Sequence, residues 1–488
     1  MRTAAALMLL LALPLSAQEP VDRVMVEKIR REGMDNSRAY AIFNHLVDVI
    51  GPRLTATPEF KTAADWSRDQ LAGWGLRDAR LESFDFGRGW RLEKFTLEMI
   101  EPRYMPLVGY PEAWSAATSG EIEAAPIAIG DTSLDELEAM KNRLTGAILL
   151  SQPLQTSFVR EDRPQPTAPG YAARPAQAQG GRGGRAGGGG ESPAQRRSRI
   201  LREAGPGVVL RTSRGEHGTM FVLGRDAREN ALPSVVVSSE HYNMILRMMA
   251  AGVPVKLRVN ATSRYLDDDR NGYNVLAELP GVDPVLENEV VMIGAHLDSY
   301  HSAPGATDNA DGSTIVLEAM RILTAVGAKP RRTIRVALWG GEEQGLLGSR
   351  AWVRRHLEGD ANAAARDHFS VYFNVDPGTG PIYGWFLQGQ ENARGAMDAW
   401  LEPLRDLGAR HNVLESIGST DHLSFTAAGL PGFNPIQDYV DYDVRTHHTN
   451  VDSFERVREA DLKQGAVVIA SFAYHAAMRD GKMPRRSP

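Results

Sequence analysis

The chain has 488 residues, of which 42% are hydrophobic and 24% are charged. This composition is typical of a globular protein of about three domains at roughly 150 residues each, and it excludes collagen-like, coiled-coil and wholly disordered chains. The net charge of −6 argues against a general nucleic-acid-binding protein, and the chain has no cysteine. Disulfide scaffolds, thiol nucleophiles and cysteine-ligated metals are therefore excluded, and any metal site must use His, Asp and Glu.

The N-terminus has the pattern of a secretory signal peptide. Met1-Arg2-Thr3 precedes an apolar run over residues 4–15, and small residues follow up to Ala17. We expect residues 1–17 to be removed and the protein to be exported, as a periplasmic or secreted protein. The apolar run is shorter than the about 20 residues of a membrane span, so we expect no stable membrane insertion.

The next residues are predicted to form the N-terminal part of the main domain, over 21–120. Apolar residues recur with helical spacing over 21–82, and Gly51-Pro52-Arg53 interrupts the pattern. Residues 95–99 alternate between apolar and polar, which indicates a strand.

Residues 121–262 have a pattern of short β runs that predicts an inserted β-rich domain. One helix is expected at 241–250, and short β runs lie at 147–150, 207–210 and 234–237. Within the insert, residues 161–205 are rich in Gly, Arg and Pro, and eight of the eleven residues from 180 to 190 are glycine. Such a tract could be an arginine–glycine nucleic-acid tail or a flexible surface loop. Export and the net negative charge favour the loop, so we expect no nucleic-acid partner.

Residues 263–488 alternate strands with helices. This alternation predicts an α/β domain with a mostly parallel central sheet covered by helices. The expected strands are 289–294, 333–339 and 369–375, and the expected helices are 313–326, 345–357, 392–407 and 461–478.

Metal-type side chains follow each of these strands. His296 and Asp298 follow the first, Glu342-Glu343 the second and Asp376 the third. Two further candidates are Asp308, in a glycine-flanked stretch that opens a helix, and the pair His447-His448. Each alone is more often a helix cap, a turn residue or a solvated charge, but ligands of open α/β sheets bind at the carboxyl ends of the strands. Five such signals in order favour a metal site.

The chemistry of this set favours zinc. Carboxylates combined with two imidazoles suit Zn²⁺, and one carboxylate shared by two metals lets both polarise one water. Asp308 lies in a loop that can approach both ions. Residues two apart on an extended chain share a face, so Asp298 can hold the second ring nitrogen of His296. Adjacent residues point apart, so Glu343 can face a metal while Glu342 faces the water as general base.

These residues resemble the co-catalytic di-zinc exopeptidases, a family with aminopeptidase and glutamate carboxypeptidase II types. The resemblance is carried by His-x-Asp-Ser, Gly-Ala-x-Asp-Asn-Ala-Asp-Gly, Gly-Glu-Glu-x-Gly-Leu-x-Gly-Ser, Asn-x-Asp and His-Thr-x-x-Asp, from His296 to Asp452. It is nearest to carboxypeptidase Q-like members, where it extends to residues 49–54 and 90–103, and the insert resembles a protease-associated domain.

The resemblance implies two zinc ions and a role for each residue. One ion would be held by His296, Asp308 and Asp376, and the second by Asp308, Glu343 and His448. Glu342 would be the base and Asp298 would orient His296. His448 is preferred to His447 because the family histidine directly precedes the threonine. Asp421-His422 resembles a family motif near the substrate pocket and receives no role.

We therefore expect a zinc-dependent metallo-exopeptidase of aminopeptidase or dipeptidase type that hydrolyses short peptides; a carboxypeptidase Q-like carboxypeptidase is the alternative. A non-catalytic binding module would be expected to lose ligands, and a single-zinc cyclase would need fewer. Gly-x-Ser-x-Gly and His-Glu-x-x-His are both absent, which argues against a serine hydrolase and the commonest helical zinc proteases. The sequence leaves the oligomeric state open, a homodimer included.

Overall fold

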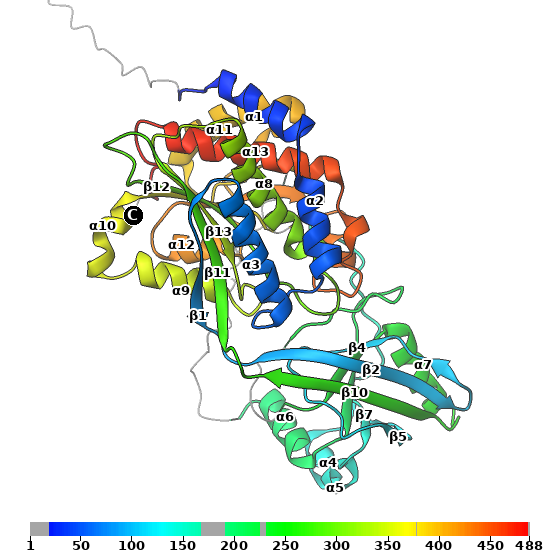
Figure 1. Cartoon of the computed structure of the whole chain (residues 1–488). Coiled ribbons are helices and arrows are strands. Elements are labelled where there is room, and N and C mark those ends of the chain that lie inside the picture. Colours follow the sequence, from blue (N-terminus) through cyan, green and yellow to red (C-terminus); the bar gives the residue numbers. More distant parts are fainter. Residues whose placement is uncertain (1–18, 167–190, 225–230, 377, 487–488) are drawn as a thin grey trace, which may run out of the picture.

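The computed structural model describes residues 19–166, 191–224, 231–376 and 378–486. The signal peptide predicted at 1–17 and the glycine-rich run at 180–190 lie outside these ranges. The chain forms a main lobe around a large sheet and a smaller lobe that we call the accessory lobe, made of two smaller sheets within residues 89–266 (Figure 1). The long strands β2 and β10 run into the accessory lobe from the main one.

The main lobe is built on an eight-stranded sheet, whose four central strands β13, β12, β14 and β17 are parallel. Antiparallel pairings flank them, β1 and β11 on one side and β15 on the other. The predicted α/β class with a largely parallel central sheet is confirmed. In spatial order the strands are β1 (Arg77–Asp85), β11 (Asn271–Leu279), β13 (Thr333–Trp339), β12 (Val290–His296), β14 (Phe369–Asn374), β17 (Gly432–Asp438), β15 (Thr379–Phe386) and β16 (His411–Val413).

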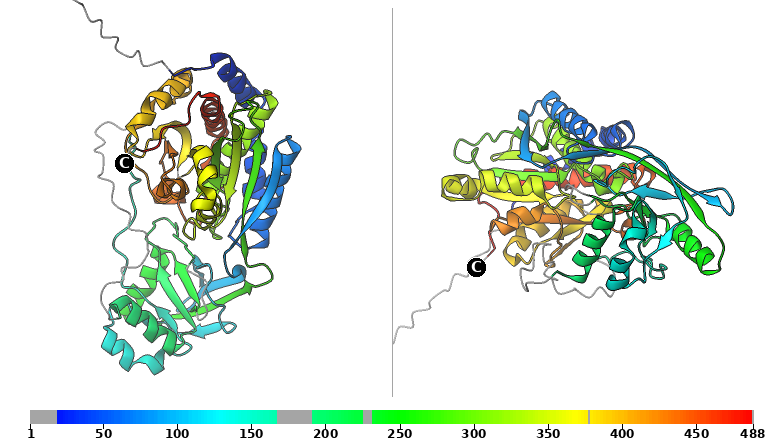
Figure 2. Two further views of the ribbon diagram at one scale, coloured as in Figure 1. Left: turned by 90° about the vertical axis from the view of Figure 1, so that its left-hand side faces the viewer. Right: turned by 90° about the horizontal axis from the view of Figure 1, so that it is seen from below.

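Helices cover both faces of this sheet, because the central strands are apolar on both sides. Val291 and Ile293 of β12 pack toward one helical layer, and the intervening Met292 packs toward the other. The first layer contains α1 (Arg23–Asp35), α2 (Ala39–Asn44), α3 (Pro58–Gly73), α8 (Asp311–Ala325) and α13 (Glu459–Met478). The second contains α9 (Leu347–His356) and α12 (His422–Ala427). Figure 2 shows the blue N-terminal helices on one side of the sheet and the yellow segments on the other.

Short helical segments complete the main lobe. A π-type turn, η1 (His45–Ile50), extends α2 up to the break at Gly51. Further short helices and helical turns lie in the later connections of the chain. These are η2 (Ala306–Ala310), η3 (Asp360–Asn362), α10 (Ala363–His368), η4 (Glu391–Ala393), α11 (Arg394–Leu401), η5 (Glu402–Leu407), η6 (Tyr442–Thr446) and η7 (Phe454–Arg456).

The predicted helical region ends earlier than residue 82. Helix α3 stops at Gly73, Gly75 adopts a φ of 88°, and β1 begins at Arg77. β1 is paired along its length with β11, almost 200 residues later in the chain. The expectation was wrong here because this pairing, which supplies the backbone hydrogen bonds of the strand, is not visible in local periodicity.

The accessory lobe contains a four-stranded and a five-stranded sheet, and they begin at Gly89, well before residue 121, where the insert was expected to start. The four-stranded sheet has the order β3 (Met105–Pro106), β2 (Gly89–Glu101), β10 (Lys256–Leu266) and β5 (Ile122–Ala124). The five-stranded sheet has the order β4 (Gly109–Pro111), β9 (Ser234–Val237), β8 (Val208–Thr212), β7 (Ile148–Leu150) and β6 (Ile127–Ala128). The helices of this lobe are α4 (Leu134–Ala139), α5 (Lys141–Leu144), α6 (Pro193–Ala204) and α7 (Ser239–Ala250).

One end of the expected flexible loop at 161–205 is a regular helix. α6 starts at a capping box in which Ser192 and Gln195 each accept a backbone N–H of the other. Its apolar face, with Ile200 and Leu201, is buried against the lobe. The loop expectation was wrong for this helix because averaging the composition over the whole tract concealed the apolar spacing of its last residues.

Among the residues that the structure describes, no helix combines the length and hydropathy needed to cross a bilayer.

Helix α13 should make a large contribution to the stability of the main lobe. The ring of Phe472 is fully buried and lies 4.9 Å from that of Trp385 and 5.7 Å from that of Trp400, centroid to centroid. We expect Phe472→Ala to lower the free energy of unfolding by about 3–5 kcal/mol through lost burial and the cavity left behind. Chemical denaturation measures this change. The control Val24→Ala, at a side chain that is 71% exposed, should change it little, and equal effects of the two variants would contradict the packing described.

Candidate metal centre

The five predicted ligands come together at the carboxyl edge of the large sheet. His296 is the last residue of β12, Glu343 follows β13, and Asp376 follows β14. Asp308 lies in the turn η2 immediately before α8, and His448 lies in the connection between β17 and α13. The residues lie up to 152 positions apart in the sequence, 448 minus 296, and the parallel strands deliver them to one place.

Asp308 occupies the middle of the cluster. Its Oδ1 lies 3.2 Å from Nε2 of His296, and its Oδ2 lies 3.2 Å from Nε2 of His448. On the first side, Oδ2 of Asp376 lies 3.8 Å from Nε2 of His296. On the second side, Oε2 of Glu343 lies 2.9 Å from Nε2 of His448. The two oxygens of one carboxylate therefore face two different sets of ligands.

The donor atoms fit divalent cations. Ligand atoms of His296, Asp308 and Asp376 all lie within 4.8 Å of one another. Nε2 of His296, Oδ2 of Asp308 and Oε1 of Glu343 are buried, and in the described part of the chain none of them makes a hydrogen bond. Buried polar atoms are normally paired, so these unpaired ones indicate a missing partner. Imidazole nitrogens and carboxylate oxygens are the ligands that zinc takes in cysteine-free sites.

His447 lies beside His448, with the ring centroids 3.9 Å apart. A ligand atom of His447 also lies within 4.8 Å of those of Asp308 and His448. Its Nε2, however, is 4.0 Å from Oδ2 of Asp308, farther than that of His448, and only His448 forms a close pair with Glu343. The geometry therefore favours His448 over His447 as the ligand.

Asp298 makes a different contact from the one expected. Nδ1 of His296 lies 2.9 Å from the backbone oxygen of Asp298, whereas the carboxylate is 3.6 Å away. Because a carbonyl only accepts, Nδ1 carries the proton, and Nε2 keeps its lone pair for a metal. The carboxylate of Asp298 is the more distant of the two groups because β12 ends at His296, so residue 298 no longer follows the geometry of a strand.

The carboxylate of Asp298 instead fixes the neighbouring loop. It accepts the backbone N–H groups of Glu342 (3.2 Å) and Glu343 (3.4 Å) and the hydroxyl of Thr55 (3.0 Å). Gly341, whose φ of 69° favours glycine, lets the chain turn sharply between β13 and these glutamates.

Arg53 supports the backbone around the candidate ligands, and the sequence analysis gave it no role. It is fully buried, and its guanidinium donates five hydrogen bonds, all to backbone carbonyls. Two of these carbonyls belong to Leu297 (2.8 Å), next to His296, and Gly305 (3.1 Å), at the start of the Asp308 turn. Burial lowers its pKa to about 10, so Arg53 remains a cation at neutral pH. No local signal marks these contacts, because Leu297 lies 244 residues away.

Asp452 fixes the Asp308 turn from the other side. Its carboxylate accepts the backbone N–H groups of Thr307 (2.8 Å) and Asp308 (3.1 Å). The sequence analysis included Asp452 in a motif without giving it a role. Its backbone contacts hold the central carboxylate of the cluster between the two histidines.

The electrostatics of the cluster also favour bound cations. Burial, with the nearby Asp308, raises the pKa of Glu343 to about 7, and burial raises that of Asp376 to about 6. The pKa of Glu342 is raised well above its ordinary value by burial and by the adjacent carboxylates. Burial alone would lower the pKa of His448, but the carboxylates of Glu343 and Asp308 raise it to about 10. Bound cations would reduce this repulsion.

Asp421 lies behind the cluster, at the start of α12. Its Oδ1 accepts a 2.5 Å hydrogen bond from the hydroxyl of Ser349, and its buried Oδ2 has no hydrogen-bond partner among the described residues. Burial raises the pKa of Asp421 to about 7. Asp421 is therefore protonated over part of the range in which an ordinary aspartate is charged.

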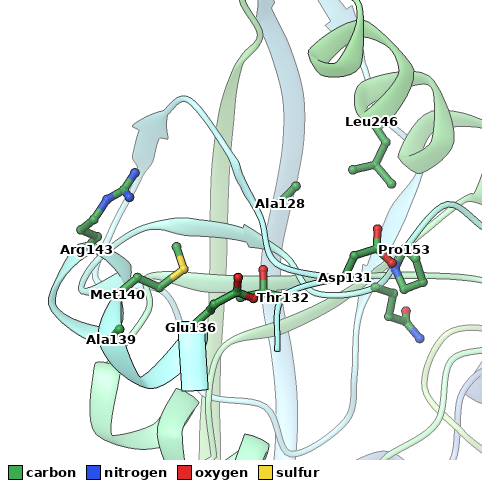
Figure 3. Close-up of a pocket in the computed structure, with 11 residues that line it drawn as sticks. Ala128, Asp131, Thr132, Glu136, Ala139, Met140, Arg143, Pro153 and Leu246 are labelled. Carbon is green, nitrogen blue, oxygen red and sulfur yellow. The ribbon is translucent and has the colours of Figure 1, made fainter. Parts of the chain in front are cut away.

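The accessory lobe carries an open hollow of about 630 Å³ near α4 and α5 (Figure 3). Asp131, Glu136 and Arg143 are among its lining residues, and none of the candidate ligands is. The hollow is therefore separate from the metal centre.

Comparisons with known proteins find one matching family model and several relatives. Residues 274–473 match the model of peptidase family M28. The chain is 25% identical over 457 residues to carboxypeptidase Q of Bos taurus, covering 93% of this chain and 88% of the relative. It is 29% identical over 242 residues to leupeptin-inactivating enzyme 1 of Streptomyces exfoliatus, covering 46% of this chain and 52% of the relative.

Solved structures share the fold. A peptidase M28 precursor from Shewanella amazonensis superposes with a TM-score of 0.72 at 23% identity, covering 96% of this chain and 99% of the other. A zinc aminopeptidase from Bacillus subtilis superposes with a TM-score of 0.61 at 19% identity, covering 91% and 95%.

The buried carboxylates should give metal-stripped protein a distinctive pH dependence. Asp421 keeps a proton in the folded state up to about pH 7, whereas the unfolded chain releases it near pH 3.8. The free energy of unfolding should therefore fall as the pH rises between these values. Asp421→Asn cannot ionise and should reduce this fall.

Denaturation of the chelator-treated protein from about pH 4 to about pH 8 measures the slope. The exposed control Asp360→Asn should keep the wild-type slope. If Asp421→Asn also keeps the wild-type slope, Asp421 titrates normally and the pKa argument is wrong.

Proposed function

We propose that this chain, whose residues 274–473 match the model of peptidase family M28, is a di-zinc exopeptidase that hydrolyses short peptides. One observation carries the proposal: the two oxygens of Asp308 face His296 on one side and His448 on the other. A carboxylate shared in this way is what a two-metal hydrolase requires.

Each zinc ion would have three protein ligands. His296, Asp308 and Asp376 would hold one ion, and Asp308, Glu343 and His448 would hold the other. Bound zinc would supply Lewis acidity, which polarises a substrate carbonyl and makes water easier to deprotonate. The second ring nitrogen of His296 donates to the Asp298 carbonyl, which supports a fixed orientation for this ligand.

Glu342 would act as the general base. It is buried beside Glu343, its backbone N–H is bound by the carboxylate of Asp298, and Asp376 lies near enough to influence its pKa. Glu342 takes a proton from the attacking water and then gives it to the leaving amine, so it returns to its starting state at each turnover. Asp298 positions this base through its carboxylate and His296 through its backbone oxygen.

The surroundings of the cluster support short substrates. His296, Asp308 and Asp376 are almost completely buried, and Tyr300 and Ser302 also line the small cavity beside the second ligand group. A long polypeptide laid across the site would need open space on both sides of the scissile bond. Access for a chain end or a dipeptide needs less.

The alternative functions fit the site less well. A single-zinc cyclase would leave one of the two ligand groups without purpose. A non-catalytic binding module would have no use for a buried glutamate next to the ligands. We also propose that the protein is exported after loss of residues 1–17 and that its insert is a protease-associated domain.

Replacing Glu342 tests the proposed base. We expect Glu342→Gln to lower kcat by about 10²–10⁴-fold, because the amide cannot accept the proton, while zinc content per chain stays at the wild-type value. Peptide hydrolysis and metal analysis on the same preparation measure both quantities. The control Glu358→Gln, at an exposed residue, should leave both unchanged. Substantial activity in Glu342→Gln would mean that another group is the base.

A dipeptide panel tests which chain end is recognised. The zinc-loaded protein should cleave free dipeptides, lose activity after chelation and regain it with added zinc. An N-terminal block that stops cleavage indicates an aminopeptidase, C-terminal amidation that stops it indicates a carboxypeptidase, and sensitivity to both indicates a dipeptidase. Zinc-independent hydrolysis, or cleavage of peptides blocked at both ends, would refute an exopeptidase of this type.

A further inference from the structure

The loop that carries His448 is held by the accessory lobe. We call residues 441–452 the histidine loop. Phe221 of the accessory lobe forms an antiparallel bridge with Thr449, and the N–H of Val222 donates to the backbone oxygen of His448 at 2.9 Å. The N–H of Met220 donates to Oδ1 of Asn450 at 2.7 Å. The backbone of the candidate ligand itself therefore depends on contacts from another lobe.

A second segment of the accessory lobe, residues 158–165, grips the start of the same loop. We call this segment the strap. Both the backbone N–H and Nε of Arg163 donate to Oδ2 of Asp443, at 2.8 and 2.7 Å, and Nη2 donates to Oδ1 at 2.5 Å. The carboxylate of Asp162 accepts the N–H groups of Asp441 (2.7 Å) and Val444 (3.0 Å). The strap thus makes five hydrogen bonds to three residues of the histidine loop, Asp441, Asp443 and Val444.

The Arg163–Asp443 pair is connected to His448 by direct contacts. Oδ1 of Asp443 lies 3.8 Å from Nδ1 of His447. The guanidinium of Arg163 lies 5.5 Å from the ring centroid of Tyr442, which stacks on His447 at 4.9 Å and 15°. His447 in turn packs against the ring of His448 at 3.9 Å. A continuous stack of side chains leads from the strap to the ligand.

His448 needs such support because its backbone is strained. Its φ is 61°, in the left-handed region that residues with a Cβ avoid. A strained residue keeps its conformation only where its surroundings impose it. Here the surroundings are the bridge to residues 220–222 and the stack that begins at Arg163.

The Arg163 pair differs from an ordinary surface ion pair. The side chain of Arg163 is 33% exposed and that of Asp443 is 20% exposed, and the guanidinium also lies over Tyr439 at 4.9 Å. Arg160, in the same strap, pairs with Glu216 of its own lobe and is 66% exposed. Arg160 therefore offers a matched control, with the same chemistry on the same segment and, among the residues that the structure describes, no hydrogen bond or ion pair to the histidine loop.

We propose that Arg163 is a positioning residue of the metal centre, through which the accessory lobe holds His448 in place to bind metal. The inference rests on the proposed function, because it needs His448 to be a zinc ligand. The accessory lobe then contributes to metal binding by positioning His448 and is more than an appended domain. The inference also predicts that loss of Arg163 weakens the ion at His448 and Glu343 more than the ion at His296 and Asp376.

The test compares Arg163→Gln, Arg163→Lys and the control Arg160→Gln. Competition with a chelator measures zinc affinity, the visible spectrum of cobalt-substituted protein reports ligand geometry, and peptide hydrolysis gives kcat and KM. In Arg163→Gln we expect the zinc ion held by Glu343 and His448 to bind about 10–100-fold less tightly, which is the usual effect of losing a partner that orients a ligand. The cobalt spectrum should change as well. Arg163→Lys should recover part of the affinity, and Arg160→Gln should match the wild type.

The outcomes separate this inference from the proposed function. If the wild type binds zinc and cleaves peptides but Arg163→Gln has the wild-type zinc affinity and cobalt spectrum, the inference is overturned and the function stands. If the wild type binds no zinc, the function itself is wrong. Should Arg163→Gln fail to unfold cooperatively, Asp443→Asn takes its place, since it keeps the shape of the partner and removes its charge. Wild-type zinc affinity in Asp443→Asn would equally overturn the inference.

Discussion

The burial of many negative charges at one edge of a sheet is the constraint on which this structure depends. Eight acidic side chains meet there almost without solvent: Asp298, Asp308, Asp311, Glu342, Glu343, Asp376, Asp421 and Asp452. Such a group is stable only if protons, buried cations or metals neutralise part of it. Arg53 supplies positive charge, and in the metal-free protein the surrounding carboxylates raise the pKa of His296 and His448, so that these rings can also be protonated. Metal ions bound by the central carboxylates would supply more, which links the folding of this edge to its chemistry.

The candidate ligands are positioned by a second layer of contacts, made by residues that hydrogen-bond to the loops carrying them. The parallel strands bring His296, Glu343 and Asp376 to the same edge, but hydrogen bonds to the loops that follow the strands fix the orientation of the side chains. Asp298 holds the turn of Glu342 and Glu343, and Arg53 holds the segment after β12. The N-terminal helical region, the α/β core and the accessory lobe all contribute to this layer. The site therefore forms only where three distant parts of the chain meet.

The separation between the ligands and the residues that surround them explains how relatives with different names can share one scaffold. The relatives found here are named for a carboxypeptidase and for inactivation of leupeptin, and the structural neighbours include an aminopeptidase. Two metals and a base activate water in the same way at either end of a peptide. The choice of end depends on the residues around the metals, and the small cavity beside Glu343 and His448 is lined by Tyr300, Ser302 and Thr449, among others.

The α/β core and the ligand chemistry at its edge can be predicted from the amino-acid sequence alone. Strand 333–339 is predicted with its observed bounds, and His296, Asp308, Glu343, Asp376 and the pair His447-His448 are identified because strand periodicity and ligand chemistry are local properties. The preference for His448 within the pair came from the resemblance to the di-zinc exopeptidases. The contacts of Arg53 and Arg163, the backbone contact of Asp298, and the strand β1 where a helix was expected are visible only in the folded chain. Each of these depends on a partner far along the chain: Leu297 for Arg53 at 244 residues and Asp443 for Arg163 at 280. Periodicity and composition describe a residue's neighbours in sequence, whereas these contacts form only when the chain folds and brings distant residues together.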